Sequence, residues 1–418
     1  MKFWKASCHG LLLAAWIGYL SSSAQAQHQQ HGASMAASAA TAVKINLVST
    51  AGFAPDGSLW LLNLNPQGKL RLLKSPDQGR SWGHERVLEL GDDKPNPSGE
   101  APAMLAFGPQ GQVLIGYPQS LGKRFTGEVR LIRSVDGGVS FSAPITVHQD
   151  RQIIGHSFPV MRFDAQGVLH LVWLDGRDKA QVAAQEGMNE KGKSSYRGSA
   201  VYRVVSQDAG ASFSADLKLA DHSCECCRIA TTLDQQGQLA LMWRHVFAPN
   251  LRDHAFARVK ADSGVIAEPT RATFDNWQVD ACPHHGGAIA PAAQQGFHAL
   301  WFGARQNEFA VRYGRLDQEG KPVGAATTLP DEAAEHADLQ SVDQRVVIIW
   351  RSYDGQQTHV KAWISDDDGQ TFKLRELAQS SEENDYPRLI TKPAGKAGEA
   401  AQIFWLWNTK AKLYVDKI

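Results

Sequence analysis

The stretch Ser75-Pro-Asp77-Gln-Gly79-Arg-Ser81-Trp82 decides the fold, because the same phrase returns three more times along the chain. The further copies begin at Ser134, Ser206 and Ser365, and all four fit the pattern S-x-D-x-G-x-[S/T]-[F/W]. An Asp carboxylate accepts hydrogen bonds from N–H groups a few residues on, and Gly tolerates a positive φ. Each copy also follows a strand-like run and therefore predicts a structural hairpin turn between two strands.

A second repeat sets the number of units. An apolar run, usually preceded by a Gly-containing turn, occurs seven times at a mean spacing of about 57 residues. Continuous apolar runs of this length favour strands that are buried on both faces. The runs are Gly57–Leu62, Gly111–Tyr117, Gly167–Trp173, Gly237–Trp243, Gly296–Trp301, Arg345–Trp350 and Ala401–Trp407.

These repeats predict an all-β chain, a β-propeller of seven four-stranded antiparallel blades, with six blades as the alternative if one run is an insertion. Residues 42–418 then form a single domain. The last unit supplies only three strands before the chain ends. We therefore expect the strand Ala42–Val48 to provide the fourth strand and to close the ring, which removes an exposed sheet edge.

The N-terminus has the features of a processing segment. Lys2 and Lys5 precede an apolar run from Gly10 to Leu20, and Ala24-Gln25-Ala26 is a small-x-small cleavage site. We expect a signal peptide over 1–26, which would discard Cys8, and a low-complexity, disordered leader over 27–41. The protein is then exported to the periplasm or beyond. No segment reaches the ~20 apolar residues of a membrane span.

Charge excludes some partners. The chain has 43 basic and 43 acidic residues, which gives no electrostatic basis for binding nucleic acid or an anionic membrane surface. We expect a monomer whose partner is a glycan or small molecule.

The loops that lead into the innermost strands of a propeller meet at one end of the central channel, whatever their separation in sequence. Such a concave, ionisable region is the default place for a binding or active site. The ionisable and aromatic residues predicted there are Glu100, His156, Arg228, His284, His285, His336 and Tyr386.

Two cysteine motifs open neighbouring units. Cys224-Glu-Cys226-Cys227-Arg228 begins the fourth unit and Cys282-Pro-His284-His285 begins the fifth, so we expect the two to lie side by side. These are all the cysteines of the expected mature chain. In an oxidising compartment they favour disulfides, with three pairings open. The alternative is a zinc or copper site, or a mixture of one bridge and a metal. The ligands would be Cys224, Cys226, Cys227, Cys282, His284 and His285.

The repeated phrase is the Asp-box, or BNR repeat. Through these repeats the whole expected mature chain resembles the sialidase superfamily. In that family the boxes face away from the active site. The family has six blades, three arginines for a substrate carboxylate, a Tyr nucleophile activated by Glu, and an Asp as acid and base. The resemblance implies Arg228, Arg252 and Arg351 as the arginines, and Tyr386 with Glu100 as the nucleophile pair. The early Arg-Ile-Pro segment is missing, however, and no Asp is clearly placed on an early loop.

The two cysteine motifs resemble those of a subgroup of exported bacterial proteins that are called sialidase-like for their Asp-boxes. The resemblance implies a glycoside hydrolase of the exo-sialidase type, or a glycan-binding protein, with its site at the channel mouth. A second hypothesis is a non-enzymatic propeller that binds zinc or copper at the Cys/His cluster. A third is a scaffold that binds another protein.

Overall fold

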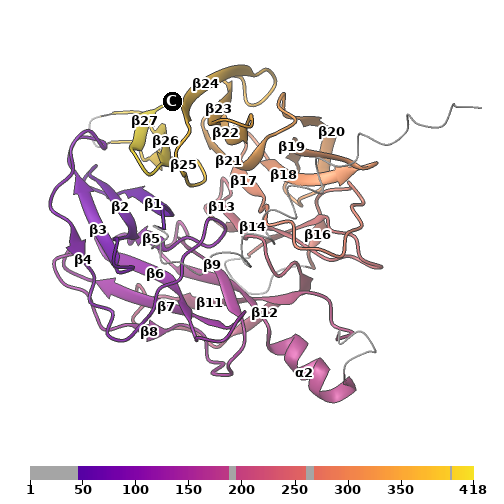
Figure 1. Ribbon diagram of the computed structural model, residues 1–418, viewed down its shortest axis with the longest axis horizontal. Coiled ribbons are helices and arrows are strands. Elements are labelled where there is room, and N and C mark those ends of the chain that lie inside the picture. The colour runs from indigo at the N-terminus through magenta and orange to yellow at the C-terminus, as the bar shows by residue number, and fades with distance from the viewer. Residues whose placement is uncertain (1–45, 188–193, 260–267, 396–397) are drawn as a thin grey trace, which may run out of the picture. The chain divides into compact units, whose positions relative to one another are not determined.

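The computed structural model describes residues 46–187, 194–259, 268–395 and 398–418. Seven antiparallel sheets surround a central axis, as Figure 1 shows from indigo to yellow. The predicted seven-bladed propeller is confirmed. The expected signal peptide and leader lie outside the described residues. Within them, no helix is long and apolar enough to cross a lipid bilayer.

Each blade begins with a strand beside the axis and continues outward. The innermost strands are β1 (Ser49–Phe53), β5 (Met104–Phe107), β9 (His156–Phe163), β13 (Ala230–Leu233), β17 (Ala288–Pro291), β21 (Glu335–Val342) and β25 (Arg388–Lys392). The second strands are β2 (Leu59–Leu64), β6 (Val113–Ser120), β10 (Leu169–Asp175), β14 (Leu239–Arg244), β18 (Phe297–Arg305), β22 (Arg345–Tyr353) and β26 (Gln402–Asn408). The second strands contain the predicted apolar runs, and β2, β10 and β14 are buried along their whole length.

The fourth strands, at the outer edge of the blades, are more exposed than the second strands. The third strands are β3 (Leu70–Ser75), β7 (Gly127–Ser134), β11 (Ser199–Ser206), β15 (His254–Arg258), β19 (Glu308–Leu316), β23 (Thr358–Ser365) and β27 (Leu413–Lys417). The fourth strands are β4 (Arg86–Val87), β8 (Ile145–Thr146), β12 (Leu217–Ser223), β16 (Thr270–Arg271), β20 (Pro322–Thr328) and β24 (Lys373–Ser380). Within the part of the chain that the structure describes, one helix, α2 (Arg177–Glu186), follows β10 and lies at the rim (Figure 1).

Apolar side chains fill the gap between each blade and the next. Between the first two blades, for example, Trp60 and Leu62 of β2 pack with Ile115 of β6. Corresponding clusters lie between the two blades of each remaining neighbouring pair. The core is therefore a set of inter-blade layers, so each blade depends on both neighbours for burial of its faces.

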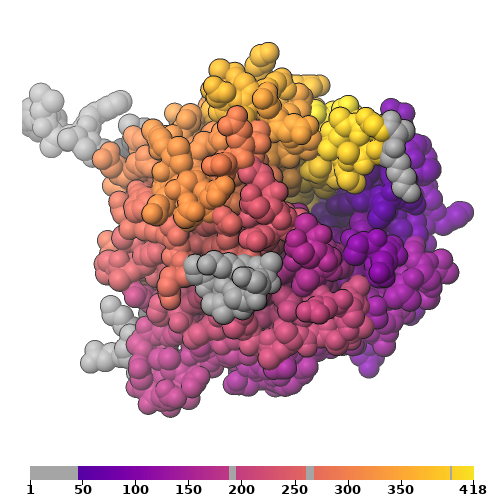
Figure 2. Space-filling model, turned by 180° about the vertical axis from the view of Figure 1, so that it is seen from behind, coloured from indigo at the N-terminus to yellow at the C-terminus, as the bar shows by residue number. Residues whose placement is uncertain are grey.

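The strand that was expected to close the ring, Ala42–Val48, lies only partly within the described residues. The sheet formed by β25, β26 and β27 has three strands among the described residues, and Asn46, Leu47 and Val48 form no strand; 42–45 lie outside the description. The first and last blades pack face to face instead. The rings of Phe53 and Phe404 lie 4.9 Å apart, and Figure 2 shows the yellow blade against the indigo one. Hydrogen bonds also join the two blades, from Ser49 N–H to Asp385 Oδ2 at 3.0 Å and from Asn408 Nδ2 to the carbonyl oxygen of Leu47 at 2.9 Å.

The repeated phrase forms the predicted turns between the third and fourth strands. In the first copy, Asp77 Oδ1 accepts from Ser81 N at 2.8 Å, and Ser75 Oγ accepts from Gly79 N at 2.7 Å. Hydrogen bonds from Ser81 and Ser75 lower the pKa of Asp77 to about 2. Gly79 has φ +94°, a conformation that favours glycine. Because the strands alternate in direction, these turns lie at the opposite end of the ring from the loops that enter the innermost strands.

Candidate functional site

Three thiols lie together in the loop between β12 and β13. The sulfur of Cys224 is 3.5 Å from that of Cys226 and 3.8 Å from that of Cys227, and the last two are 3.8 Å apart. All three side chains are buried. A disulfide places its sulfurs about 2.05 Å apart. None of these pairs is bridged, so the described structure does not show the disulfides that the export hypothesis favoured.

The fourth cysteine comes from the next blade, as expected from the order of the units. Cys282, in the loop between β16 and β17, is exposed, and its thiol shares a hydrogen bond with that of Cys226. The two motifs are therefore adjacent. Together they form a group that we call the thiol cluster: Cys224, Cys226, Cys227 and Cys282.

Positive charge is held beside the thiol cluster. Arg244 is 1% exposed and donates to the carbonyl oxygens of Arg252, His285 and Phe302 at 3.1, 3.0 and 2.7 Å. Hydrogen bonds from Cys226 and Cys227, with the charges of Arg244 and Arg252, hold the pKa of Cys224 well below its usual range. The same hydrogen bonds raise the pKa values of the two donor thiols. The site thus favours at least one thiolate.

His254, which was not predicted as a metal ligand, lies near the cysteines. His254, at the start of β15, is 1% exposed, and its Nε2 has no hydrogen-bond partner among the described residues. Burial and Arg244 lower its pKa well below the usual value, while Cys224 acts in the opposite direction. His254 is therefore a neutral imidazole with an unused ring nitrogen. Only folding brings it here, because 26 residues separate it from Cys227 and Cys282 lies in another blade.

The two histidines that were predicted as metal ligands have different surroundings. His284 is exposed and has a left-handed backbone, φ +53°. The ring of His285 is stacked between those of Phe302, at 4.2 Å, and His336, at 4.4 Å. Among the described residues, no hydrogen bond joins either histidine to a thiol. The turn at His284 separates Cys282 from His285, whose side chain faces the channel. The spacing of these residues in the sequence does not reveal this turn.

Glu100 lies at the centre of the channel end and connects several blades. Its Oε2 accepts from Gly286 N at 2.8 Å, and its Oε1 lies 3.5 Å from Arg228 Nη1 and 3.3 Å from His336 Nδ1. Burial alone would raise the pKa of Glu100, but Arg228, His336 and Arg388 outweigh it and hold the pKa well below the usual range. A side chain at Gly286 would collide with Arg228 and Glu100, so only glycine fits there.

A column of rings continues from this carboxylate. His336 stacks on Tyr386 at 3.5 Å with the planes 8° apart, and the guanidinium of Arg351 lies 4.7 Å from the Tyr386 ring. Arg351 also pairs with Glu335 at 3.0 Å. Burial raises the pKa of Tyr386 to about 12. Its hydroxyl is therefore neutral at ordinary pH, and no hydrogen bond joins it to Glu100 among the described residues.

The structure brings four of the five predicted catalytic residues to one end of the channel. Glu100, Arg228, Arg351 and Tyr386 surround His336, whereas Arg252 lies beside Cys224 and Cys282. His336 belongs to the wider predicted set, and Glu335 was not predicted. Beside His285 and His336 the protein leaves a cavity of about 10 Å³, room for about one water molecule.

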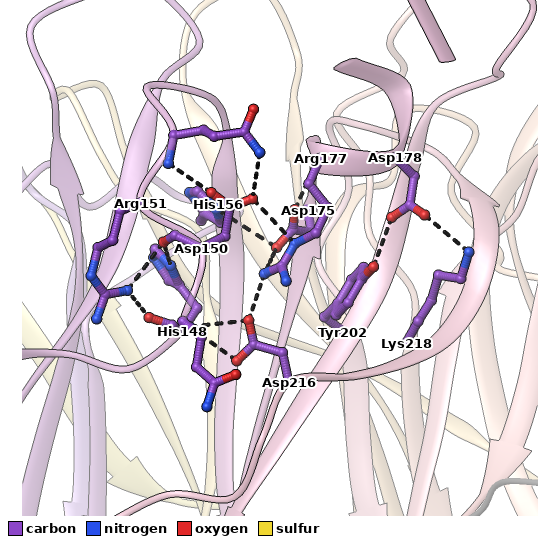
Figure 3. A network of polar contacts seen from close by, with 12 residues as sticks. His148, Asp150, Arg151, His156, Asp175, Arg177, Asp178, Tyr202, Asp216 and Lys218 are labelled. Carbon is purple, nitrogen blue, oxygen red and sulfur yellow. Dashed lines mark hydrogen bonds and ion pairs between the residues drawn. The ribbon is translucent and has the colours of Figure 1, made fainter. Parts of the chain in front are cut away.

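A second polar network, drawn in Figure 3, involves the third blade and the loop that leads into it. Arg177 Nη2 donates to Asp175 Oδ2 and Asp216 Oδ2, both at 2.7 Å, and Arg177 Nε lies 3.5 Å from Asp150 Oδ2. Burial would raise the pKa of Asp175, but Arg177 outweighs it and keeps the carboxylate ionised. One guanidinium therefore compensates three largely buried carboxylates from separate segments.

Buried histidines predict acid sensitivity. Burial lowers the pKa of His148 to about 3 and those of His245 and His298 to about 4. An unfolded histidine titrates near 6.5. Below that pH the unfolded chain takes up protons that the native state refuses, so stability is lost as pH falls from about 6.5 toward 4. Thermal melts at pH 7.5, 6.5, 5.5 and 4.5 should show a falling midpoint, with a shallower fall for His298→Gln. A flat profile would contradict the assignment of neutral histidines.

The fold is shared with known proteins at low sequence identity. A polysaccharide lyase of family PL25, an ulvan lyase, matches with a TM-score of 0.55 and 11% identity over 88% of this chain and 91% of that one. A second structure of a PL25 ulvan lyase, bound to -[GlcA(1-4)Rha3S]-, matches with a TM-score of 0.54 and 11% identity over the same shares of the two chains. The Hadza microbial sialidase Hz136 gives 0.48 and 12% identity over 90% and 74%. No protein-family model and no curated protein matches the sequence. The two matches to ulvan lyases, with TM-scores above 0.5, establish the fold alone.

Proposed function

We propose that this propeller binds one soft metal ion, Zn²⁺ or Cu⁺, at the thiol cluster. The distances between the three buried sulfurs support the proposal. Thiolates bind zinc at about 2.3 Å, and two tetrahedral ligands at that radius lie about 3.8 Å apart. The observed separations of 3.5, 3.8 and 3.8 Å match that spacing in all three pairs.

The surroundings suit such an ion. Thiolate ligands select zinc or Cu⁺ over magnesium or calcium. The negative charge of several thiolates needs compensation in a buried place, and Arg244 and Arg252 supply it. The loop is also anchored, because Cys224 N–H donates to the carbonyl oxygen of Arg244 at 2.8 Å. The cluster is therefore prearranged, which reduces the ordering that an ion must impose.

Elemental analysis of protein purified without chelator tests the proposal. We expect about one zinc or copper ion per chain, and loss of it in Cys224→Ser, because one of three buried ligands is removed. His284→Ala is the matched control. It changes an exposed residue that lies two positions from Cys282 and has no hydrogen bond to a thiol among the described residues, and it should keep the ion. If the three thiols only contact one another, the purified protein contains no metal. The proposal is refuted if metal-free protein then takes up neither Zn²⁺ nor Cu⁺ when it is titrated with them.

A second candidate function is supported by the channel end. Arg228 and Arg351 lie on either side of the group formed by Glu100, His336 and Tyr386, which is the kind of arrangement that holds a carboxylate. We propose as this second candidate that the channel mouth binds an acidic glycan, as an exo-sialidase-like or glycan-binding site. Because Arg252 lies beside the thiols, only Arg228 and Arg351 of the three predicted arginines would hold the substrate carboxylate.

Binding and hydrolysis assays with sialosides and uronic-acid polysaccharides test this candidate. If it holds, Arg351→Ala should lower the affinity at least tenfold, because Arg351 is a charged partner of the carboxylate. Tyr386→Phe should abolish hydrolysis but retain binding if Tyr386 is the nucleophile. Activity that is unchanged in both variants, or no binding by the wild type, would exclude a glycan site at the channel mouth.

A further inference from the structure

Cys282 differs from the other members of the thiol cluster in position and exposure. Cys224, Cys226 and Cys227 are 1%, 5% and 2% exposed and share one loop of the fourth blade. Cys282 is exposed, and it reaches the cluster from a loop of the fifth blade. A hydrogen bond with Cys226 connects it to the group. Three thiols thus form the buried part of the site, and the fourth lies between them and solvent.

We propose, building on the metal site proposed above, that Cys282 is an exchangeable ligand through which the ion passes to an acceptor that offers sulfur, either a thiol or a thioether. A purely structural zinc site is closed by its protein ligands. Here one ligand can leave without exposing the buried loop, and the vacated position faces solvent. The incoming sulfur then reaches the ion while three protein thiolates still hold it.

The exchange balances without any change of oxidation state. The bond between the metal and the Cys282 sulfur breaks, and a bond from the acceptor sulfur forms. When the acceptor is a thiol, it releases a proton as it binds, and the Cys282 thiolate takes up one proton on leaving. Later steps replace the remaining three thiolates in the same way.

Arg252 is placed to assist the first step. It lies close enough to Cys224 and Cys282 to interact electrostatically with both thiols. Its Nε is buried and has no hydrogen-bond partner among the described residues. Before the departing Cys282 thiolate takes up its proton, this unused donor stabilises it, because a hydrogen bond to an ionised partner is among the stronger ones in proteins. Arg252 is therefore inferred to be a positioning residue for the open form.

Metal-transfer kinetics test the inference on the full mature protein. The protein is loaded with Zn²⁺, and transfer to the dye 4-(2-pyridylazo)resorcinol is followed by absorbance. We expect Cys282→Ser to keep one ion per chain and to transfer it at least ten times faster, because the outer ligand is missing. Cys227→Ser should bind no ion. Transfer at the wild-type rate from Cys282→Ser would show that Cys282 is no ligand, and loss of the ion would make it a core ligand; either result overturns the inference.

Alkylation provides an independent readout. N-ethylmaleimide should label Cys282 of the loaded wild type first and leave the three buried cysteines unlabelled, as measured by mass spectrometry. Equal protection of all four cysteines would mean that Cys282 does not exchange. The melting temperature of each metal-free variant reports whether it still folds. If the wild type takes up no metal at all, the metal-binding function itself fails, an outcome distinct from a tightly held ion that does not exchange.

Discussion

Glu100→Gln is expected to lower the free energy of unfolding by about 3–5 kcal/mol, the usual cost of removing one partner from a buried ion pair. The carboxylate is 5% exposed and lies within 3.5 Å of Arg228 Nη1. Glutamine has the same shape but no charge, so the buried guanidinium would lose its counter-ion. Urea denaturation, with the midpoint and slope fitted separately, measures the change.

Two further variants separate the ion pair from a general effect. Glu383→Gln changes a glutamate whose side chain is 61% exposed, and its unfolding free energy should stay within about 0.5 kcal/mol of the wild type. The double variant Glu100→Gln with Arg228→Met should lose less than the sum of the two single variants, because it leaves no buried charge. Strict additivity, or a loss below about 1 kcal/mol for Glu100→Gln, would contradict the role of Glu100 as a link between blades.

Arg177→Leu should cost a similar amount, about 3–5 kcal/mol at neutral pH, since it leaves three buried carboxylates without their shared cation. The side chains of Asp150, Asp175 and Asp216 are 7%, 0% and 4% exposed. Like charges without compensation take up protons more readily. The loss relative to the wild type should therefore shrink as the pH is lowered from 7 to 5, and denaturation at both pH values measures it.

The network in Figure 3 also contains a suitable control. Lys218→Met removes a lysine that is 40% exposed and pairs with Asp178, and it should change stability by less than about 1 kcal/mol. The variant Arg177→Leu with Asp216→Asn should regain part of the loss because one carboxylate charge is gone. A deficit for Arg177→Leu that does not depend on pH would mean that lost packing, not charge, accounts for it.

The local signals predicted the blades well. Turn chemistry at Asp77 and its repeats, and apolar runs such as Gly167–Trp173, are short-range properties, so they could be interpreted residue by residue. The same reasoning was wrong about part of ring closure. Residues 46–48, the end of the strand predicted over 42–48, form no strand, and the first and last blades pack through Phe53 and Phe404.

The candidate site was predicted in outline only. The order of the units was enough to place the motif of Cys224 beside that of Cys282. It was not enough to predict that His285 faces the channel, because a single left-handed residue, His284, turns the loop. Nor did it predict that Glu100 would bind Gly286 and Arg228 from other blades rather than Tyr386.

The sequence by itself determined the repeating unit, its turns, the number of blades and the neighbouring positions of the two cysteine motifs. These follow from hydrogen bonds and burial patterns within a few tens of residues. Only the tertiary structure decided which side chains form ion pairs, sulfur contacts or stacked rings with one another. Such contacts join loops from different blades, and their geometry depends on the packing of the whole ring, as the triangle of Cys224, Cys226 and Cys227 with Cys282 beside it shows.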